Sequence, residues 1–298
     1  MKKLLFYSVL VLLIGTAACD KVSENDYLEP VSSVNDTSFF SDTTVETSQL
    51  DGIRHVLIED YTGHTCGNCP EAAEIAKAIH ENHPEQVVVM AVHSGFFAKP
   101  KTSGTAFTSD YRTTEGEALD EFFGNSGAGN PNGLINRIDY PAQTQVKQMG
   151  SWAVLTQSEL AKTPAIKLAT KVLYKDSTRT LRINTHSTFL SDYPRPTRMV
   201  VHITEDSIID WQKDYRLPSG QQDISNYVHR HVLRATLNGQ FGTALTSAAA
   251  TVGQIAPAYF NYEIPAKYKV EHCHVVVAIM DAETYEIIQV KELGIPLP

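Results

Sequence analysis

Two cysteines separated by two residues, Cys66 and Cys69, have the spacing that most directly suggests chemistry in this sequence. A CxxC pair can be a redox-active dithiol, one half of a zinc site or a structural disulfide. A structural zinc site normally takes four ligands. The chain has no second CxxC, although His64 and Cys273 are further candidate ligands. The residues alone therefore leave all three chemistries open.

The segment that follows the cysteines predicts a helix that would position them. Apolar residues recur at helical spacing within residues 70–83, and the helix should end at His83, because the next residue is proline. We expect Cys66 at the N-cap and exposed, where free N–H groups and the helix dipole stabilise a thiolate. Cys69, one turn further on and more buried, would then resolve a mixed disulfide.

Strands on either side of this helix complete a strand–helix–strand unit. Residues 55–61 and residues 86–92 are apolar runs, and the second run is continuous, which is typical of a strand buried on both faces. Thr114 and Glu117 predict a capping box at the start of another helix. The other elements expected in this region are a strand over 134–138 and a helix over 149–162.

From residue 163 to the C-terminus, the sequence consists of short β-rich runs separated by turn residues. Several of these runs alternate apolar and polar residues, as half-buried strands do. A series of short strands without intervening helices is typical of an antiparallel sandwich. The predicted fold is therefore an α/β domain over residues 52–162 followed by an all-β, immunoglobulin-like sandwich domain over residues 163–298.

The N-terminus predicts export to a membrane. Lys2 and Lys3 precede a short apolar run and a group of small residues, as in a secretory signal peptide covering residues 1–18. A cysteine in the next position is typical of a bacterial lipoprotein signal. We therefore expect Cys19 to be acylated and to anchor a flexible acidic tether, residues 19–51.

The charge balance argues against one class of partner. The formal net charge is −9 at pH 7, and removal of the signal peptide with its two lysines changes it to −9 − 2 = −11. Binding to nucleic acid needs a basic footprint, so we expect no nucleic-acid partner. The chain also lacks the Gly-x-x-x-x-Gly-Lys and Gly-x-Ser-x-Gly motifs, and we expect no cofactor.

Four histidines in the C-terminal half could form a second site. His229 and His231 would share one face of a strand, as would His272 and His274, and such a set can in principle bind a metal. We prefer the alternative, in which these histidines are hydrogen-bonded rim or core residues, and expect no metal. Cys273 would lie on the opposite face of its strand as a small buried residue.

Three arginines have two interpretations each. Arg230 and Arg234, beside Tyr227, could hold the two domains together or grip an anionic ligand, and the structural role is the expected one. Arg137 lies near the end of the predicted strand over 134–138, and it would be either near the cysteine pair or on an exposed strand.

The segment VLIEDYTGHTCGNCPEAA, residues 56–73, resembles the thioredoxin superfamily, in which a strand runs into a CxxC motif and then a helix. The resemblance implies that Asp60 is a buried acid that exchanges protons with the resolving cysteine. It also implies that Pro131 is a cis-proline packed against the disulfide. Two departures are Thr65, where the family usually has tryptophan, and the inner dipeptide Gly67-Asn68 in place of Gly-Pro.

Nearly the whole chain is similar to the twenty-eight-kilodalton outer-membrane lipoprotein family of Gram-negative bacteria. The likeness rests on the lipoprotein signal, the acidic tether and the segments EDYTGHTCGNCP, GNPNGLINR and VVVAIMDAETYEIIQV. It implies a lipid-anchored outer-membrane protein on the periplasmic or cell-surface face, with a thioredoxin-like domain over residues 52–162 and a β-rich C-terminal domain. It does not specify a substrate.

Two hypotheses for function stand side by side. The first is a thiol–disulfide oxidoreductase or isomerase that acts on exported proteins, with Cys66 as nucleophile, Cys69 as resolving cysteine, Asp60 in proton transfer and Pro131 shaping the substrate groove. The second is a non-catalytic surface binding or accessory protein of an outer-membrane complex, in which the CxxC is a structural disulfide. Exposure of the Cys66 sulfur would favour the first hypothesis, and a covered sulfur would favour the second.

Overall fold

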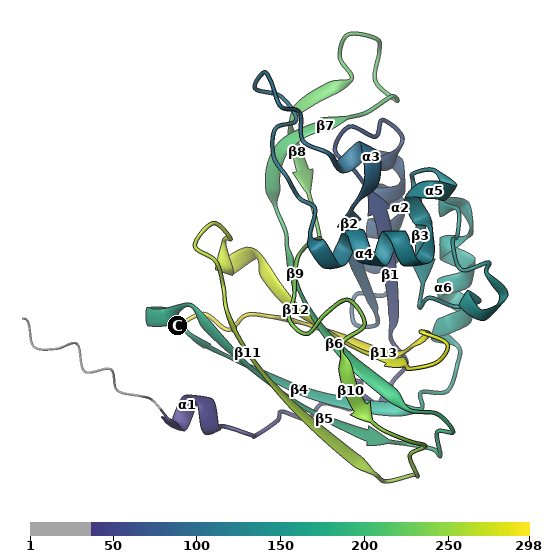
Figure 1. The fold of residues 1–298 in the computed structure, drawn as a ribbon, viewed down its shortest axis with the longest axis vertical. Helices are drawn as coiled ribbons and strands as arrows, with labels where there is room; N and C mark the ends of the chain where they lie inside the picture. Colours follow the sequence, from purple (N-terminus) through teal and green to yellow (C-terminus); the bar gives the residue numbers. More distant parts are fainter. Residues whose placement is uncertain (1–36) are drawn as a thin grey trace, which may run out of the picture. The chain divides into compact units, whose positions relative to one another are not determined.

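The segment around the cysteines folds as a strand, a helix and a second strand, as predicted. In the computed structural model, which describes residues 37–298, β1 (Val56–Thr62) leads into the cysteine loop and α2 (Cys69–Asn82) follows it (Figure 1). β2 (Val87–His93) pairs with β1 in parallel. The helix ends just before Pro84, as predicted, with His83 as its C-cap.

Helices cover both faces of this unit. β3 (Asn132–Ile135) pairs antiparallel to β1, and α2 and α6 (Trp152–Leu160) share a core with one face of these strands. α4 (Thr114–Phe123) packs on the opposite face. All seven positions of β2 are buried, because apolar neighbours lie on both sides of the strand. The prediction that the continuous apolar run forms a strand buried on both faces is therefore confirmed.

The N-terminus of α4 lies one residue from its predicted position. Thr113, and not Thr114, is the N-cap, because its hydroxyl accepts a hydrogen bond from the Gly116 N–H at 2.9 Å. The predicted partner, Glu117, instead accepts a hydrogen bond from the Gly95 N–H at 3.2 Å. The Glu117 carboxylate thus holds a tertiary contact instead of completing a capping box.

Strands from both halves of the chain form one long sheet. Its strand order is β13-β12-β6-β9-β2-β1-β3, with β10 paired to β6. The two halves meet where β9 pairs with β2 through Val232 and Ala91. The strands contributed by the C-terminal half are β6 (Thr197–Glu205), β9 (Val232–Thr236), β10 (Thr243–Thr246), β12 (Cys273–Asp281) and β13 (Ile287–Gly294).

A second sheet packs against the C-terminal part of the first. It has the order β11-β5-β4, and apolar side chains from these strands, β6 and β12 share one core. The immunoglobulin-like topology and the domain boundary at residue 162 stay predictions. The strands of this sheet are β4 (Ile166–Lys175), β5 (Thr180–Phe189) and β11 (Ile255–Glu263).

A hairpin, β7 (Ile208–Lys213) and β8 (Asp223–His229), extends beyond the sheets toward the cysteine loop (Figure 1). Arg230 and His231 separate β8 from β9, and His231 has φ +52°. The single strand expected to carry both His229 and His231 therefore does not form. The short helices are α1 (Thr37–Ser41), η1 (Gln49–Gly52), α3 (Gly95–Ala98), α5 (Asn125–Ala128), η2 (Tyr140–Ala142), η3 (Met149–Ser151), η4 (Asp176–Thr178) and η5 (Val270–His272).

The predicted signal peptide, residues 1–18, and the predicted lipidation site Cys19 lie outside the described residues. Within residues 37–298, no helix is long and apolar enough to cross a membrane.

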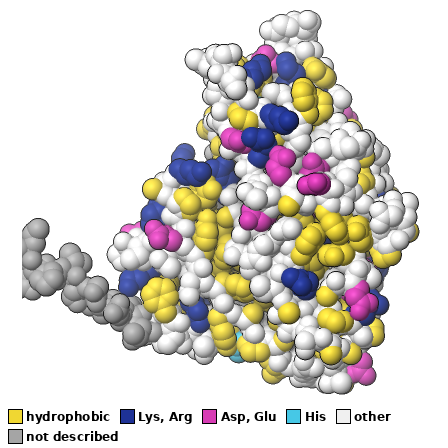
Figure 2. Space-filling model, in the orientation of Figure 1, with side chains coloured by type: hydrophobic (Ala, Val, Ile, Leu, Met, Phe, Trp, Pro, Cys, Tyr) yellow, Lys and Arg dark blue, Asp and Glu magenta, His cyan; other side chains and the backbone are white. Residues whose placement is uncertain are grey.

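Acidic and basic side chains are interspersed on the face shown in Figure 2.

Candidate functional site

Cys66 and Cys69 are joined by a disulfide. Asn68 is the N-cap of α2 and Cys69 is its first residue, so the expectation that Cys66 caps the helix is wrong. Cys66 is only 2% exposed and Cys69 is 1% exposed. The predicted exposed sulfur of Cys66 is therefore covered in this structure.

The β7–β8 hairpin lies along one side of the cysteine loop. The Lys213 N–H donates to the His64 carbonyl at 2.9 Å, and the Tyr215 N–H donates to the Gly67 carbonyl at 2.8 Å. The Gln212 side chain also donates to the Cys66 carbonyl at 3.0 Å. These hydrogen bonds fix the hairpin to the backbone of the CxxC loop.

Close packing reinforces the same contact. The Tyr215 ring lies so near Gly67 that a Cβ added there would stand 2.3 Å from the Tyr215 Cγ. On the other side of the loop, the N–H and hydroxyl of Thr65 both donate to the Phe97 carbonyl, at 3.1 Å and 2.8 Å. Two segments distant in sequence therefore hold the cysteine loop between them.

Asp60 is the titratable group beneath the disulfide. It lies in β1, is 2% exposed, and its Oδ1 atom has no hydrogen-bond partner within the described residues. Burial raises the pKa of the Asp60 carboxyl to about 7. Asp60 and Cys69 line a common small cavity of about 30 Å³. The carboxyl is thus placed near Cys69 with a pKa suited to taking up or releasing a proton.

The peptide bond between Asn130 and Pro131 is cis, as the resemblance implied. Pro131 directly precedes β3, and β3 pairs with β1 so that Gly133 lies opposite Asp60. The role of Pro131 in a substrate groove stays a prediction.

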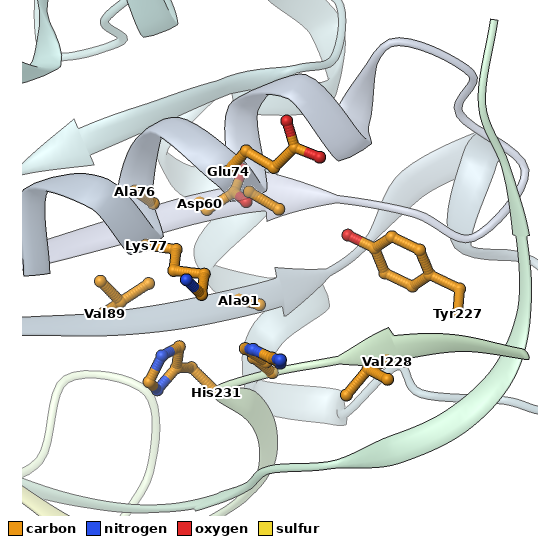
Figure 3. Close-up of a pocket in the computed structure, with 11 residues that line it drawn as sticks. Asp60, Glu74, Ala76, Lys77, Val89, Ala91, Tyr227, Val228 and His231 are labelled. Carbon is orange, nitrogen blue, oxygen red and sulfur yellow. The ribbon is translucent and has the colours of Figure 1, made fainter. Parts of the chain in front are cut away.

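A larger cavity opens on another side of Asp60. Its volume is about 360 Å³, and α2, β1, β2 and the end of β8 line it. Figure 3 shows Tyr227 with its hydroxyl directed into this cavity and Lys77 extending toward it from α2. No sequence pattern pointed to this cavity, because its walls come from two distant parts of the chain, residues 60–91 and 227–231.

The four C-terminal histidines do not form one group. His229 lies against His93, with ring centroids 5.7 Å apart, whereas His231 and His274 both face Asp206 across 3.7 Å and 3.6 Å. No set of three or more metal-ligand side chains is in place within residues 37–298. The histidines were expected to pair along strands, but the break between β8 and β9 separates them.

The buried histidines His93 and His229 should make the stability of the fold sensitive to acid. Burial lowers the pKa of His93 well below its usual value and that of His229 to about 4. The unfolded chain would take up protons near pH 6.5 and the folded chain would not, so stability should fall as the pH drops from about 6.5 to about 4.

We expect urea unfolding to show a loss of about 2 kcal/mol at pH 5 relative to pH 7.5 from His229 alone. His229→Gln should make this pH dependence shallower, whereas His83→Gln, at the end of α2, should not. Equal pH dependence in the wild type and His229→Gln would contradict the prediction.

The arginines have structural contacts, with one exception. Arg137 is fully buried and makes two hydrogen bonds of 2.8 Å with Glu59, so it is not an exposed strand residue. Arg234 pairs with Glu205 at 3.2 Å. Arg230 is exposed and lines the larger cavity.

Cys273 is a buried free thiol, as expected. Burial raises the pKa of this thiol to about 12. It is therefore not available as a third redox cysteine near neutral pH.

Comparison with known proteins identifies the class. The family described as outer membrane protein Omp28 matches residues 117–296. This chain belongs to that family, which supports a location at the outer membrane. A search of curated proteins found no significant sequence match.

Solved structures show a related fold. HBP35 of Porphyromonas gingivalis matches with a TM-score of 0.60 at 15% identity, over 82% of this chain and 76% of that one. A protein of Agrobacterium tumefaciens matches with a TM-score of 0.50 at 13% identity, over 83% and 97%. A domain of the outer membrane lipoprotein Omp28 from P. gingivalis matches with a TM-score of 0.30 at 16% identity, over 45% and 90%.

Proposed function

We propose that this Omp28-family protein is an outer-membrane lipoprotein with a thioredoxin-like domain over residues 52–162. Its Cys66–Cys69 pair would exchange electrons with thiols or disulfides of exported proteins. Lipidation at Cys19 would hold the body at the membrane. The arrangement of α2 and α6 on one face of β2-β1-β3, and of α4 on the other, supports the thioredoxin-like part of the proposal.

The buried, unpaired carboxyl of Asp60 beside Cys69 is the observation that supports the redox proposal. A buried carboxyl oxygen without a hydrogen-bond partner destabilises a fold, and a structural disulfide has no use for one. A resolving cysteine does need a nearby proton acceptor, because the thiolate is the nucleophile in exchange. The cavity shared by Asp60 and Cys69 provides this proximity.

The chemistry would proceed in two steps. The Cys66 thiolate attacks a substrate disulfide, which forms a mixed disulfide and releases one substrate sulfur as a thiolate. Asp60 takes the proton of the Cys69 thiol, and the Cys69 thiolate attacks the Cys66 sulfur. The second substrate sulfur leaves, so the substrate gains two electrons and the pair becomes a disulfide. The reverse sequence oxidises a substrate dithiol.

The covered sulfur places a condition on this mechanism. A substrate disulfide reaches Cys66 only when the β7–β8 hairpin separates from the cysteine loop. Tyr215 is 54% exposed, so its ring can rotate into the solvent and away from Gly67. The hairpin would therefore keep the pair closed until a substrate displaces it.

The same burial favours a second candidate function. With Cys66 only 2% exposed, the disulfide could fasten the loop on which the hairpin rests. The protein would then be a non-catalytic binding or accessory component of an outer-membrane complex. A reduction potential separates the two functions.

We expect the Cys66–Cys69 pair to have a reduction potential between about −120 and −270 mV, the span of catalytic pairs. Equilibration of the full chain with glutathione or dithiothreitol buffers, followed by alkylation of free thiols, would measure it. A potential below about −300 mV would establish the structural disulfide and the second function.

Loosening the hairpin provides a second test. Tyr215→Ala removes the ring that lies over Gly67 and should raise the rate of disulfide reduction by dithiothreitol about tenfold or more. Tyr259→Ala, which removes a partly exposed tyrosine of β11, is the matched control. Unchanged reduction in Tyr215→Ala would mean that this ring does not restrict access.

A further inference from the structure

The cavity of about 360 Å³ has the size and lining of a small-molecule site. Ligand pockets are mostly apolar and carry a few convergent polar groups. Here the polar groups come from β1, α2 and the segment 227–231. The apolar walls are formed by Ala73, Ala76, Val89, Ala91 and Val228.

The charges around the cavity leave one cation without a partner. Glu74 is bound by Arg216 through two hydrogen bonds of 2.5 Å and 3.0 Å. Lys77 is paired with Glu81 at 2.5 Å. The Arg230 side chain makes no hydrogen bond or ion pair with any residue from 37 to 298, and it is exposed. The Arg230 guanidinium acts on Glu81 and His231 only through its charge, without direct contact. The cavity therefore presents a guanidinium whose N–H donors are unoccupied within residues 37–298, beside apolar walls.

The remaining polar groups suit a ligand with limited polarity. The Tyr227 hydroxyl is directed into the cavity, and it can donate or accept a hydrogen bond. Asp60 contributes a buried carboxyl that burial keeps partly uncharged near neutral pH. Neither group adds a fixed negative charge that would cancel Arg230.

We propose that this cavity binds a small amphipathic carboxylate, with its carboxylate on Arg230 and its apolar body against the alanine and valine walls. A guanidinium presents two parallel N–H donors that match a carboxylate. This binding site shares Asp60 with the proposed redox function, but it does not require the Cys66–Cys69 pair to react.

Three matched probes test the charge requirement. Fluorine NMR of 4-(trifluoromethyl)benzoate, 4-(trifluoromethyl)benzyl alcohol and 4-(trifluoromethyl)benzylamine would follow binding to the purified full chain. We expect the carboxylate to bind at least tenfold more tightly than the alcohol or the amine. Equal binding of the alcohol would overturn the assignment of the carboxylate to Arg230.

Two variants locate the site. Arg230→Gln should weaken binding of the carboxylate at least tenfold and leave binding of the alcohol unchanged. Ala73→Leu fills part of the cavity from α2 and should weaken binding of all three probes. Lys267→Gln, at an exposed position outside the cavity, should change nothing.

Other outcomes would reject the proposal. Carboxylate binding that persists in both Arg230→Gln and Ala73→Leu would place the probe elsewhere. Absence of binding by every probe would exclude the site. Self-association of the full chain that Ala73→Leu abolishes would assign the cavity to a second copy. Because these readouts do not involve the disulfide, they remain valid if the redox proposal fails.

Discussion

Replacement of Arg137 by methionine should lower the free energy of unfolding by about 3–5 kcal/mol. Arg137 and Glu59 are both fully buried, and the guanidinium makes two hydrogen bonds of 2.8 Å to the carboxylate. Loss of the guanidinium would leave the Glu59 charge in the interior without compensation. Urea unfolding of the wild type and of Arg137→Met, at one pH, measures the difference.

A double variant separates the lost ion pair from lost packing. Glu59→Leu together with Arg137→Met removes both charges, and a buried pair replaced by apolar residues is often neutral or stabilising. We expect the double variant to recover most of the stability lost in Arg137→Met. Lys77→Met, in an exposed pair with Glu81, should cost less than about 1 kcal/mol. A double variant as unstable as the single one would show that packing dominates.

Asp60→Asn should stabilise the oxidised protein and slow its exchange chemistry. Burial raises the pKa of Asp60 to about 7, whereas an unfolded chain ionises this group near pH 4. The folded chain therefore holds a proton that the unfolded chain has lost, so Asp60 costs stability increasingly from about pH 4 to pH 7 and constantly above that. Asparagine removes this cost, which is roughly 4 kcal/mol at pH 8.

Urea unfolding of the wild type and Asp60→Asn at pH 4 and pH 8 would measure this effect. We expect the variant to gain free energy of unfolding at pH 8 but not at pH 4. On the redox proposal, Asp60→Asn should also slow resolution of a mixed disulfide by about 10²-fold at pH 7, because general-base assistance is lost. Glu121→Gln, at an exposed carboxylate on α4 away from the cavity, is the control. A stability gain without slower resolution would support the structural disulfide, and no gain at either pH would contradict the raised pKa.

Asp60 and Arg137 also differ in how far the sequence could predict their positions. The resemblance of residues 56–73 to the thioredoxin superfamily located Asp60 as a buried acid. Glu59, its neighbour in β1, is also fully buried. Its partner Arg137 was not predicted, because the contact spans 78 positions and depends on how β1 and the end of β3 are placed.

Local pattern was sufficient for the elements around the cysteines. Proline ended α2, and a continuous apolar run produced a strand buried on both faces. These features depend on backbone sterics and side-chain period, which act over a few residues. The same short-range information also indicated the β-rich C-terminal half.

Only the tertiary structure decided whether Cys66 is accessible. The loop that carries Cys66 is held by Gln212 and Tyr215, about 150 positions away, and by Phe97. It likewise separated His229 from His231 and assembled the cavity beside Arg230. Such contacts depend on where whole strands are placed, and a periodic pattern carries no information about that. The chemistry that a CxxC suggests is local, but access to it is a property of the complete fold.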